Sequence, residues 1–253
     1  MTSFTRFFLT CVLLGSVACG GANDSSKEAA PAPAAVVANP VDLATAGGLK
    51  GTIKIEGTPP AAQTINRQSD PYCAQQGETK TENFVVNDGG LQNVFVYVKD
   101  GLGDMKFPVP TTPVVLDQKG CMYAPRIFGI QAGQPLEILN SDETLHNIHA
   151  LPMNNREFNR GQALKGLRQT HVFTTAEVMV PFKCDVHKWM NAWVGVLNHP
   201  FYAVSGQGGA FDIQHLPPGT YTIEAWHEKL GTQTQTVTIG PKETKELSFT
   251  FKL

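Results

Sequence analysis

The chain has 253 residues, and its 20 Lys and Arg nearly balance 22 Asp and Glu, which gives a formal net charge of −2 at pH 7. This length allows one or two ordinary domains. Because the chain shows no stripe of Lys and Arg that could meet phosphates, its charge argues against a nucleic-acid partner.

Residues 1–19 are predicted to be a secretory or lipoprotein signal. Arg6 precedes an apolar stretch, residues 7–18, that is too short to span a membrane. Cys19 follows small residues and precedes two glycines, which resembles the bacterial lipoprotein signal, in which this cysteine becomes the acylated N-terminus. We expect a lipid anchor at Cys19 and a periplasmic or cell-surface location, with plain secretion after nearby cleavage as the alternative.

Residues 20–48 follow as a predicted disordered tether. They contain Ala-Pro repeats and few bulky side chains, so they cannot bury enough apolar surface to fold. Such a tether would let the folded part stand away from a membrane.

From residue 49 the chain is predicted to be all-β, with short alternating runs bounded by Gly, Pro, Asn and Asp, and no long helix is expected. Residues 87–90 predict a tight turn. Residues 154–169 carry four basic side chains with little periodicity, and we expect an exposed loop there. The clearest strand runs are residues 51–55, 94–98, 172–173, 221–226, 236–239 and 247–251.

The strongest functional signal is a cysteine, a histidine and a methionine spaced three residues apart, Cys184, His187 and Met190, with His146 and His149 upstream. A thiolate, two imidazoles and a thioether are the ligand set of blue-copper electron-transfer centres. Zinc is the competing metal for a cysteine and two histidines. It prefers a fourth hard or thiolate ligand, so the thioether favours copper.

The residues before Cys184 are predicted to form a strand that delivers its thiol into a core. Val178, Val180 and Phe182 alternate with the residues between them, which places Cys184 on the apolar face. Pro181 lacks a backbone donor and therefore indicates an edge strand or a bulge.

This combination resembles the cupredoxins, and the ligand loop is similar to that of amicyanin-type members. The resemblance covers residues 111–200 and implies a Greek-key β-sandwich. Asn147 is implied to tie the two ligand segments together, His149 is the second choice if the strand register slips, and His187 is the implied electron exit. The implied ligands of one type 1 copper ion are His146, Cys184, His187 and Met190.

Two cysteines then remain without a role, Cys73 and Cys121. Of the five cysteines, Cys11 belongs to the leader, Cys19 to the processing site and Cys184 to the metal. Leftover cysteines in an oxidising compartment are expected to pair, so we predict a Cys73–Cys121 disulfide, with two buried free thiols as the alternative.

Residues 208–221 resemble carboxypeptidase regulatory-like domains, which are small transthyretin-like β-sandwiches. Residues 201–253 alone make a thin sandwich, and the early runs look like its missing strands. We therefore predict that residues 49–110 and 201–253 form one split sandwich into which the cupredoxin domain, residues 111–200, is inserted. A tandem of two separate domains is the alternative.

These features predict an extracytoplasmic blue copper protein that carries single electrons between redox partners through transient encounters. One alternative is a copper-binding protein for trafficking or storage, and another is a non-redox extracellular binding module. An enzyme is not expected, because an oxidase or nitrite reductase needs further histidine clusters. Four histidines without ligand spacing are expected at the surface or in packing: His171, His199, His215 and His227.

Overall fold

The computed structural model describes residues 37–253. The predicted signal, residues 1–19 with Cys19, and most of the predicted tether lie outside the described residues. The tether prediction runs two residues too far, because the first strand begins at Gly47. Among the described residues, no helix has the length and apolar character needed to cross a membrane.

The described part is nearly all β, which confirms the predicted fold class. Its helical elements are one turn of α-helix, α1 (Pro71–Ala74), and one 3₁₀ turn, η1 (Gln207–Gly209). The strands are β1 (Gly47–Glu56), β2 (Val86–Asn87), β3 (Gly90–Leu91), β4 (Phe95–Asp100), β5 (Val114–Lys119), β6 (Met122–Ala124), β7 (Ile127–Gln131), β8 (Pro135–Asn140), β9 (His146–Ala150), β10 (Phe158–Gln162), β11 (Arg168–Val172), β12 (Glu177–Lys183), β13 (Asn191–Leu197), β14 (Tyr202–Val204), β15 (Ala210–Leu216), β16 (Gly219–His227), β17 (Gly231–Ile239) and β18 (Thr244–Lys252).

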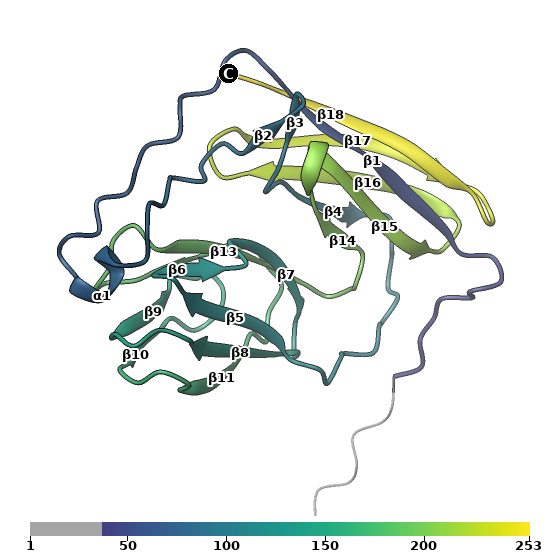
Figure 1. Cartoon of the computed structure of the whole chain (residues 1–253). Coiled ribbons are helices and arrows are strands. Elements are labelled where there is room, and N and C mark those ends of the chain that lie inside the picture. The colour runs from purple at the N-terminus through teal and green to yellow at the C-terminus, as the bar shows by residue number, and fades with distance from the viewer. Residues whose placement is uncertain (1–36) are drawn as a thin grey trace, which may run out of the picture. The chain divides into compact units, whose positions relative to one another are not determined.

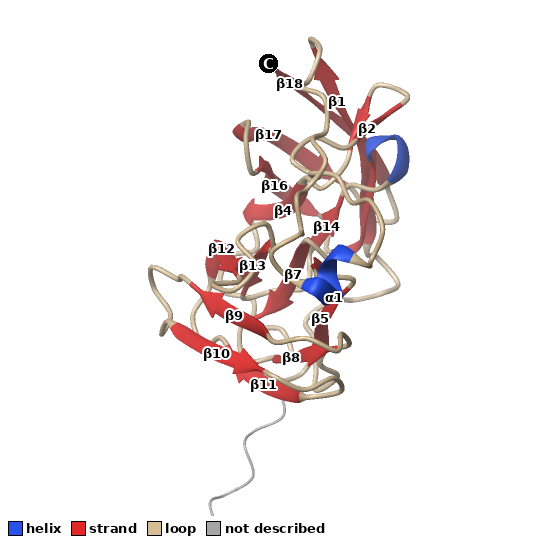
Figure 2. Ribbon diagram, turned by 60° about the vertical axis from the view of Figure 1, so that its left-hand side comes forward, coloured by secondary structure: helices blue, strands red, loops and turns tan. Residues whose placement is uncertain are grey.

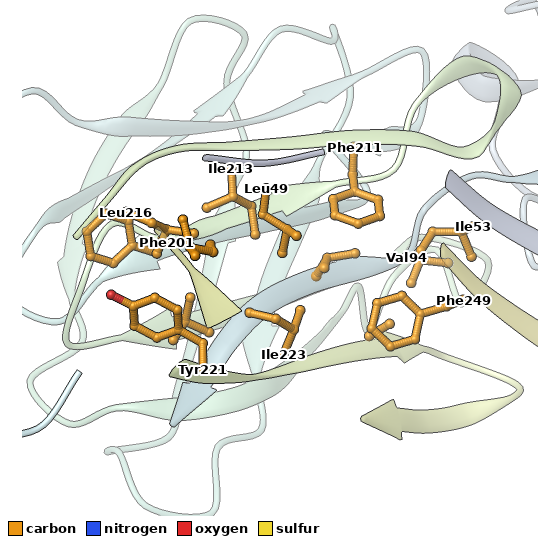
Figure 3. Packing of buried hydrophobic residues seen from close by; sticks show 14 of the residues in the cluster. Leu49, Ile53, Val94, Phe201, Phe211, Ile213, Leu216, Tyr221, Ile223 and Phe249 are labelled. Carbon is orange, nitrogen blue, oxygen red and sulfur yellow. The ribbon is translucent and has the colours of Figure 1, made fainter. Parts of the chain in front are cut away.

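One pair of sheets, here called the terminal sandwich, takes its strands β1–β4 and β14–β18 from both ends of the described chain. β1 pairs antiparallel with β15 and parallel with β18, and Figure 1 shows β1 and β18 side by side. The second sheet has the order β14-β4-β16-β17. Buried apolar side chains fill the space between the two sheets (Figure 3), among them Leu49, Ile53, Phe211, Ile223 and Phe249.

The central sandwich consists of β5–β13. One sheet has the order β10-β9-β12-β13-β7 and the other the order β11-β8-β5-β6. Figure 2 labels strands of both sheets, among them β9 and β10 of the first and β8 and β11 of the second. Two pairs are parallel, β13 with β7 and β5 with β8, and the rest are antiparallel. The core between them includes Leu116, Phe128, Ile138, Phe173, Phe182 and Val194.

A third cluster of buried side chains joins strands of the two sandwiches. Phe95 and Tyr97 on β4 pack with Ile127, Met179 and Leu197 from the central sandwich. Beside this cluster, the guanidinium of Arg126 forms an ion pair with Glu228 at 2.5 Å, with both side chains almost fully buried. The strand pairing thus gives each sandwich its own strands, while the division into independent domains stays a prediction.

The expected loop over residues 154–169 is a wrong prediction. β10 lies within it, and β11 begins at Arg168. β10 pairs with β9, with Phe158 opposite Ala150, and half-buried side chains alternate with exposed ones along β10. Arg160 takes a half-buried position on the same face as Phe158, over whose ring it packs, so a charged residue concealed the alternation.

Two predictions for β12 need correction. Of the two alternatives that Pro181 indicated, the edge strand is wrong, because β12 lies between β9 and β13, whereas the bulge agrees with a register shift between Glu177 and Val180. β12 pairs with β9 only at Phe182 and Lys183, so the missing donor of Pro181 falls where that pairing has ended. The alternation also fails at its start: Val178 is exposed and Met179 is buried, because the register against β13 shifts between Glu177 and Val180.

Candidate metal centre

Two strands and one loop bring the predicted ligands together. His146 begins β9, and β12 leads into the loop from Cys184 to Met190, after which β13 starts. The loop is closed by its own backbone, since the Cys184 N–H donates to the Met190 carbonyl at 3.1 Å and the Met190 N–H donates to the His187 carbonyl at 2.9 Å. This closure holds residues 184, 187 and 190 within one tight turn.

Three donor atoms converge at this turn. The Nδ1 atoms of His146 and His187 are 3.0 Å apart, and the Cys184 sulfur lies 4.0 Å from Nδ1 of His187. All three donor atoms lie within 4.8 Å of one another, and their side chains are buried. Met190, in the same loop, is fully buried.

The Cys184 thiol is held in a form suited to binding a metal. Burial raises its pKa, but hydrogen bonds from His146, His187 and the backbone outweigh burial and lower the pKa to about 6. For His146, burial lowers the pKa, while Asp142 and Cys184 raise it and prevail. The thiolate, which is the metal-binding form of cysteine, is therefore favoured near neutral pH.

The outer nitrogen of each imidazole meets a carboxylate. Nε2 of His146 is 2.8 Å from Asp142, and Nε2 of His187 is 3.0 Å from Asp70. Burial raises the pKa of Asp70, but hydrogen bonds from Cys73, Thr144 and His187 lower it to about 2. An ionised carboxylate only accepts hydrogen bonds, so Nε2 of each imidazole carries a proton and Nδ1 faces the centre, where it hydrogen-bonds to the other donor atoms and can bind a metal once it carries no proton.

A disulfide lies directly against this site. Cys73 and Cys121 are joined, as the cysteine count predicted, with an S–S distance of 2.04 Å. The sulfur of Cys73 is 3.8 Å from Nε2 of His187. Cys73 is in α1, whose first residue is Pro71 and whose N-cap is Asp70, so the cap of this turn and the carboxylate at His187 are the same residue.

His187 does not reach the surface, contrary to the exit role that the resemblance implies. Its side chain is only 2% exposed. The Trp189 ring packs against the imidazole with centroids 5.0 Å apart, and the indole N–H of Trp189 donates to the Cys121 carbonyl at 2.9 Å. The α1 turn, the disulfide and Trp189 together cover the imidazole.

Asn147 and His149 take different places. The Asp185 N–H donates to the Asn147 side-chain oxygen at 2.9 Å, which links β9 to the ligand loop. His149 points elsewhere and contacts Asp185 and Glu157 at 2.8 Å and 2.7 Å. The structure brings His146, and not His149, to Cys184 and His187.

Sequence reasoning missed the two carboxylates. Asp142 lies four residues before His146, and Asp70 directly precedes Pro71, a pair typical of a helix start. That signal would have identified Asp70 as a cap. Its contact with His187 depends on a pairing between residues 117 positions apart, which no local pattern records.

Comparison with known proteins gives partial matches. The family model described as polysaccharide lyase family 4, domain II, matches residues 173–247, a stretch that crosses the predicted boundary at residue 200. No curated protein sequence matches the chain.

Several solved structures resemble part of the chain. A copper-containing nitrite reductase from Thermus scotoductus SA-01 shows 18% identity and a TM-score of 0.33, over 40% of this chain and 26% of the reductase chain. A purple cupredoxin from Nitrosopumilus maritimus shows 23% identity and a TM-score of 0.29, over 34% of this chain and 98% of its own. A methionine-to-alanine mutant of amicyanin in the Cu(I) form shows 18% identity and a TM-score of 0.31, over 40% of this chain and 97% of the amicyanin chain. The chain thus spans about a quarter of the nitrite reductase, and similarity this low carries no functional inference.

Proposed function

We propose that the protein binds one copper ion through His146, Cys184, His187 and Met190 and carries single electrons between redox partners. The observation that carries this proposal is the convergence of two Nδ1 atoms and a sulfur within 4.8 Å in a buried site. Copper, when bound, supplies a one-electron redox couple.

The donor chemistry fits this metal. Imidazole and thiolate are both ligands of copper, and the thioether of a buried methionine is the weak axial ligand of blue-copper sites. The carboxylates hold both Nε2 atoms, and the loop backbone holds Cys184 and His187 in one turn. A site fixed in this way resists rearrangement when the charge of the metal changes, which favours electron transfer over chemistry on a substrate.

Absorption and electron spin resonance of the copper-loaded protein test the proposal. We expect a strong thiolate-to-copper band that Cys184→Ser abolishes, because serine offers no thiolate. His146→Gln should lose the band and His149→Gln should keep it, since His149 contacts Asp185 and Glu157 instead. A copper-loaded wild type without the band contradicts the assignment.

Copper storage is a second candidate, and the burial of His187 favours it. An imidazole that is 2% exposed gives a partner no direct contact with a ligand. Cyclic voltammetry separates the two functions: a carrier shows fast reversible exchange, and a storage protein shows slow exchange.

Location and partners complete the proposal. We propose a lipid anchor at Cys19 that keeps the protein at a bacterial membrane, where it meets a redox protein through a small, transient interface. Mass spectrometry of the mature N-terminus tests the anchor, with Cys19→Ala as the control. A mature chain whose Cys19 carries no acyl group would overturn it.

A further inference from the structure

Both halves of the disulfide hold a carboxylate of the candidate metal centre. The Cys73 N–H donates to Asp70 at 2.9 Å, and Asp70 holds Nε2 of His187. The Cys121 N–H donates to Asp142 at 2.7 Å, and Asp142 holds Nε2 of His146. Each cysteine of the disulfide is therefore connected to one imidazole through two successive hydrogen bonds, with a carboxylate between them.

The two halves are also cross-linked by side chains. The Tyr72 hydroxyl, next to Cys73, donates to Asp142 at 3.3 Å. The Thr144 hydroxyl, two residues before His146, donates to Asp70 at 2.7 Å. Asp142 thus has partners on both sides of the disulfide, Tyr72 and Cys121, while Asp70 has Cys73 and Thr144.

These contacts have a specific consequence for metal binding. A carboxylate at Nε2 fixes both the tautomer and the ring orientation of a metal-binding imidazole, and losing such a partner typically weakens metal affinity about 10- to 100-fold. The backbone amides of Cys73 and Cys121 contribute one hydrogen bond each to holding these carboxylates in position. Separating the two segments would release both imidazoles.

We propose that the Cys73–Cys121 disulfide, acting through Asp70 and Asp142, holds both imidazoles in the metal-binding orientation, so that copper affinity depends on this disulfide. The dependence of copper affinity rests on the proposed function. The orientation of the imidazoles does not, and it is measurable in the metal-free protein.

The first experiment measures the imidazoles of the metal-free protein by ¹⁵N NMR. In the wild type, both His146 and His187 should carry a slowly exchanging proton on Nε2, because each Nε2 faces a carboxylate. Asp70→Asn keeps an N-cap and an acceptor for the Cys73 N–H, but its amide group can donate to Nε2. This variant should shift His187 toward the Nδ1–H tautomer and leave His146 unchanged.

Glu177→Gln is the matched control. Glu177 also accepts several backbone N–H groups, from Met153, Asn154 and Asn155, but it touches neither imidazole. Both histidine signals should stay as in the wild type. A wild type whose two imidazoles exchange freely, or an Asp70→Asn variant whose His187 signal is unchanged, overturns the proposal.

The second experiment titrates Cu(I) against a chromophoric chelator. We expect Asp70→Asn to weaken the affinity about 10- to 100-fold. The double variant Cys73→Ser/Cys121→Ser should weaken it similarly while circular dichroism shows a folded chain. In the Asp70→Asn background, removing the disulfide should lower the Cu(I) affinity by a smaller factor than in the wild type. The reason is that the disulfide acts through Asp70 and Asp142, and the contact through Asp70 is already lost.

The disulfide could instead stabilise the fold and have no influence on the site. In that case the serine double variant melts at a lower temperature but binds Cu(I) with wild-type affinity, and the proposal fails. Should the double variant not fold, the result for Asp70→Asn still decides the role of the carboxylate. Should the wild type show slowly exchanging Nε2 protons on both imidazoles but no thiolate-to-copper band, the proposed orientation of the imidazoles stands and the proposed function fails.

Discussion

Arg126 and Glu228 form a buried ion pair beside the cluster that joins the two sandwiches. Their side chains are 5% and 3% exposed, and the guanidinium also packs over the Trp193 ring. Removing one partner leaves a charge buried without compensation, which typically costs about 3–5 kcal/mol. We expect Glu228→Ala to lower the free energy of unfolding by this amount, measured by urea denaturation.

An apolar replacement of both partners is the control for this ion pair. Arg126→Met/Glu228→Leu removes both charges together, so it should cost much less than Glu228→Ala. A double variant as unstable as the single one would show that the pair contributes through packing and not through charge.

His227 makes the protein sensitive to acid. Burial and the nearby charge of Arg126 lower its pKa from 6.5 to about 4. The unfolded chain therefore takes up a proton below pH 6.5 that the folded chain refuses until about pH 4, so stability is present above pH 6.5 and is lost as the pH falls through this window. Burial lowers the pKa of His171 and His199 to about 4 as well, so these residues add to the same acid sensitivity. We therefore expect His227→Phe, whose ring can pack against Phe84 and Phe251, to reduce the fall in melting temperature between these pH values without removing it.

Residue identities could be predicted where chemistry and spacing act together. Cys184, His187 and Met190 are recognisable because few other roles need these types three residues apart. Asp70 and Asp142 could not be predicted, since a carboxylate near a turn is common and its partner is chosen by the fold. The selection of His146 over His149 likewise depends on which face of β9 meets the loop.

At the scale of elements, two glycines allow strands of the two sandwiches to approach closely. A Cβ on Gly195 in β13 would lie 2.3 Å from the Phe95 ring of β4, and one on Gly129 in β7 would lie 2.3 Å from the Tyr202 ring. Gly195→Ala should lower the free energy of unfolding by about 1–3 kcal/mol, because the added methyl group would clash with the buried Phe95 ring. Gly206→Ala is the control, since nothing lies within 4 Å of its added Cβ and its φ is −101°.

Strands were predictable from sequence where apolar side chains line one face, as in β16, or both faces, as in β4. β10 was missed because its less exposed face carries the polar residues Arg160 and Gln162 beside Phe158, in a stretch too short for clear periodicity. The tight turn at 87–90 was correct, since Asp88 and Gly89 both have positive φ, as a two-residue hairpin of this type requires. A tight turn can thus be predicted from its own residues, whereas the pairing partner of a short strand cannot.

At the scale of the whole molecule, the terminal sandwich depends on pairing between strands from opposite ends of the chain. β15 and β18 both pair with β1, and β14 and β16 both pair with β4. The sequence suggested this arrangement because residues 201–253 are too few for a sandwich. It could not give the parallel register of β1 with β18, which has no local signature.

The same pairing predicts how fragments behave. A fragment of residues 201–253 lacks β1 and β4, so β16 and β17 are its only pair of full-length neighbouring strands, and an isolated hairpin is marginal in water. We expect this fragment to be unfolded by circular dichroism and amide exchange. Residues 111–200 are the comparison, because β5–β13 pair among themselves, and we expect this fragment to keep its β signal. A C-terminal fragment that folds alone would support two tandem domains, because its strands would then not need β1.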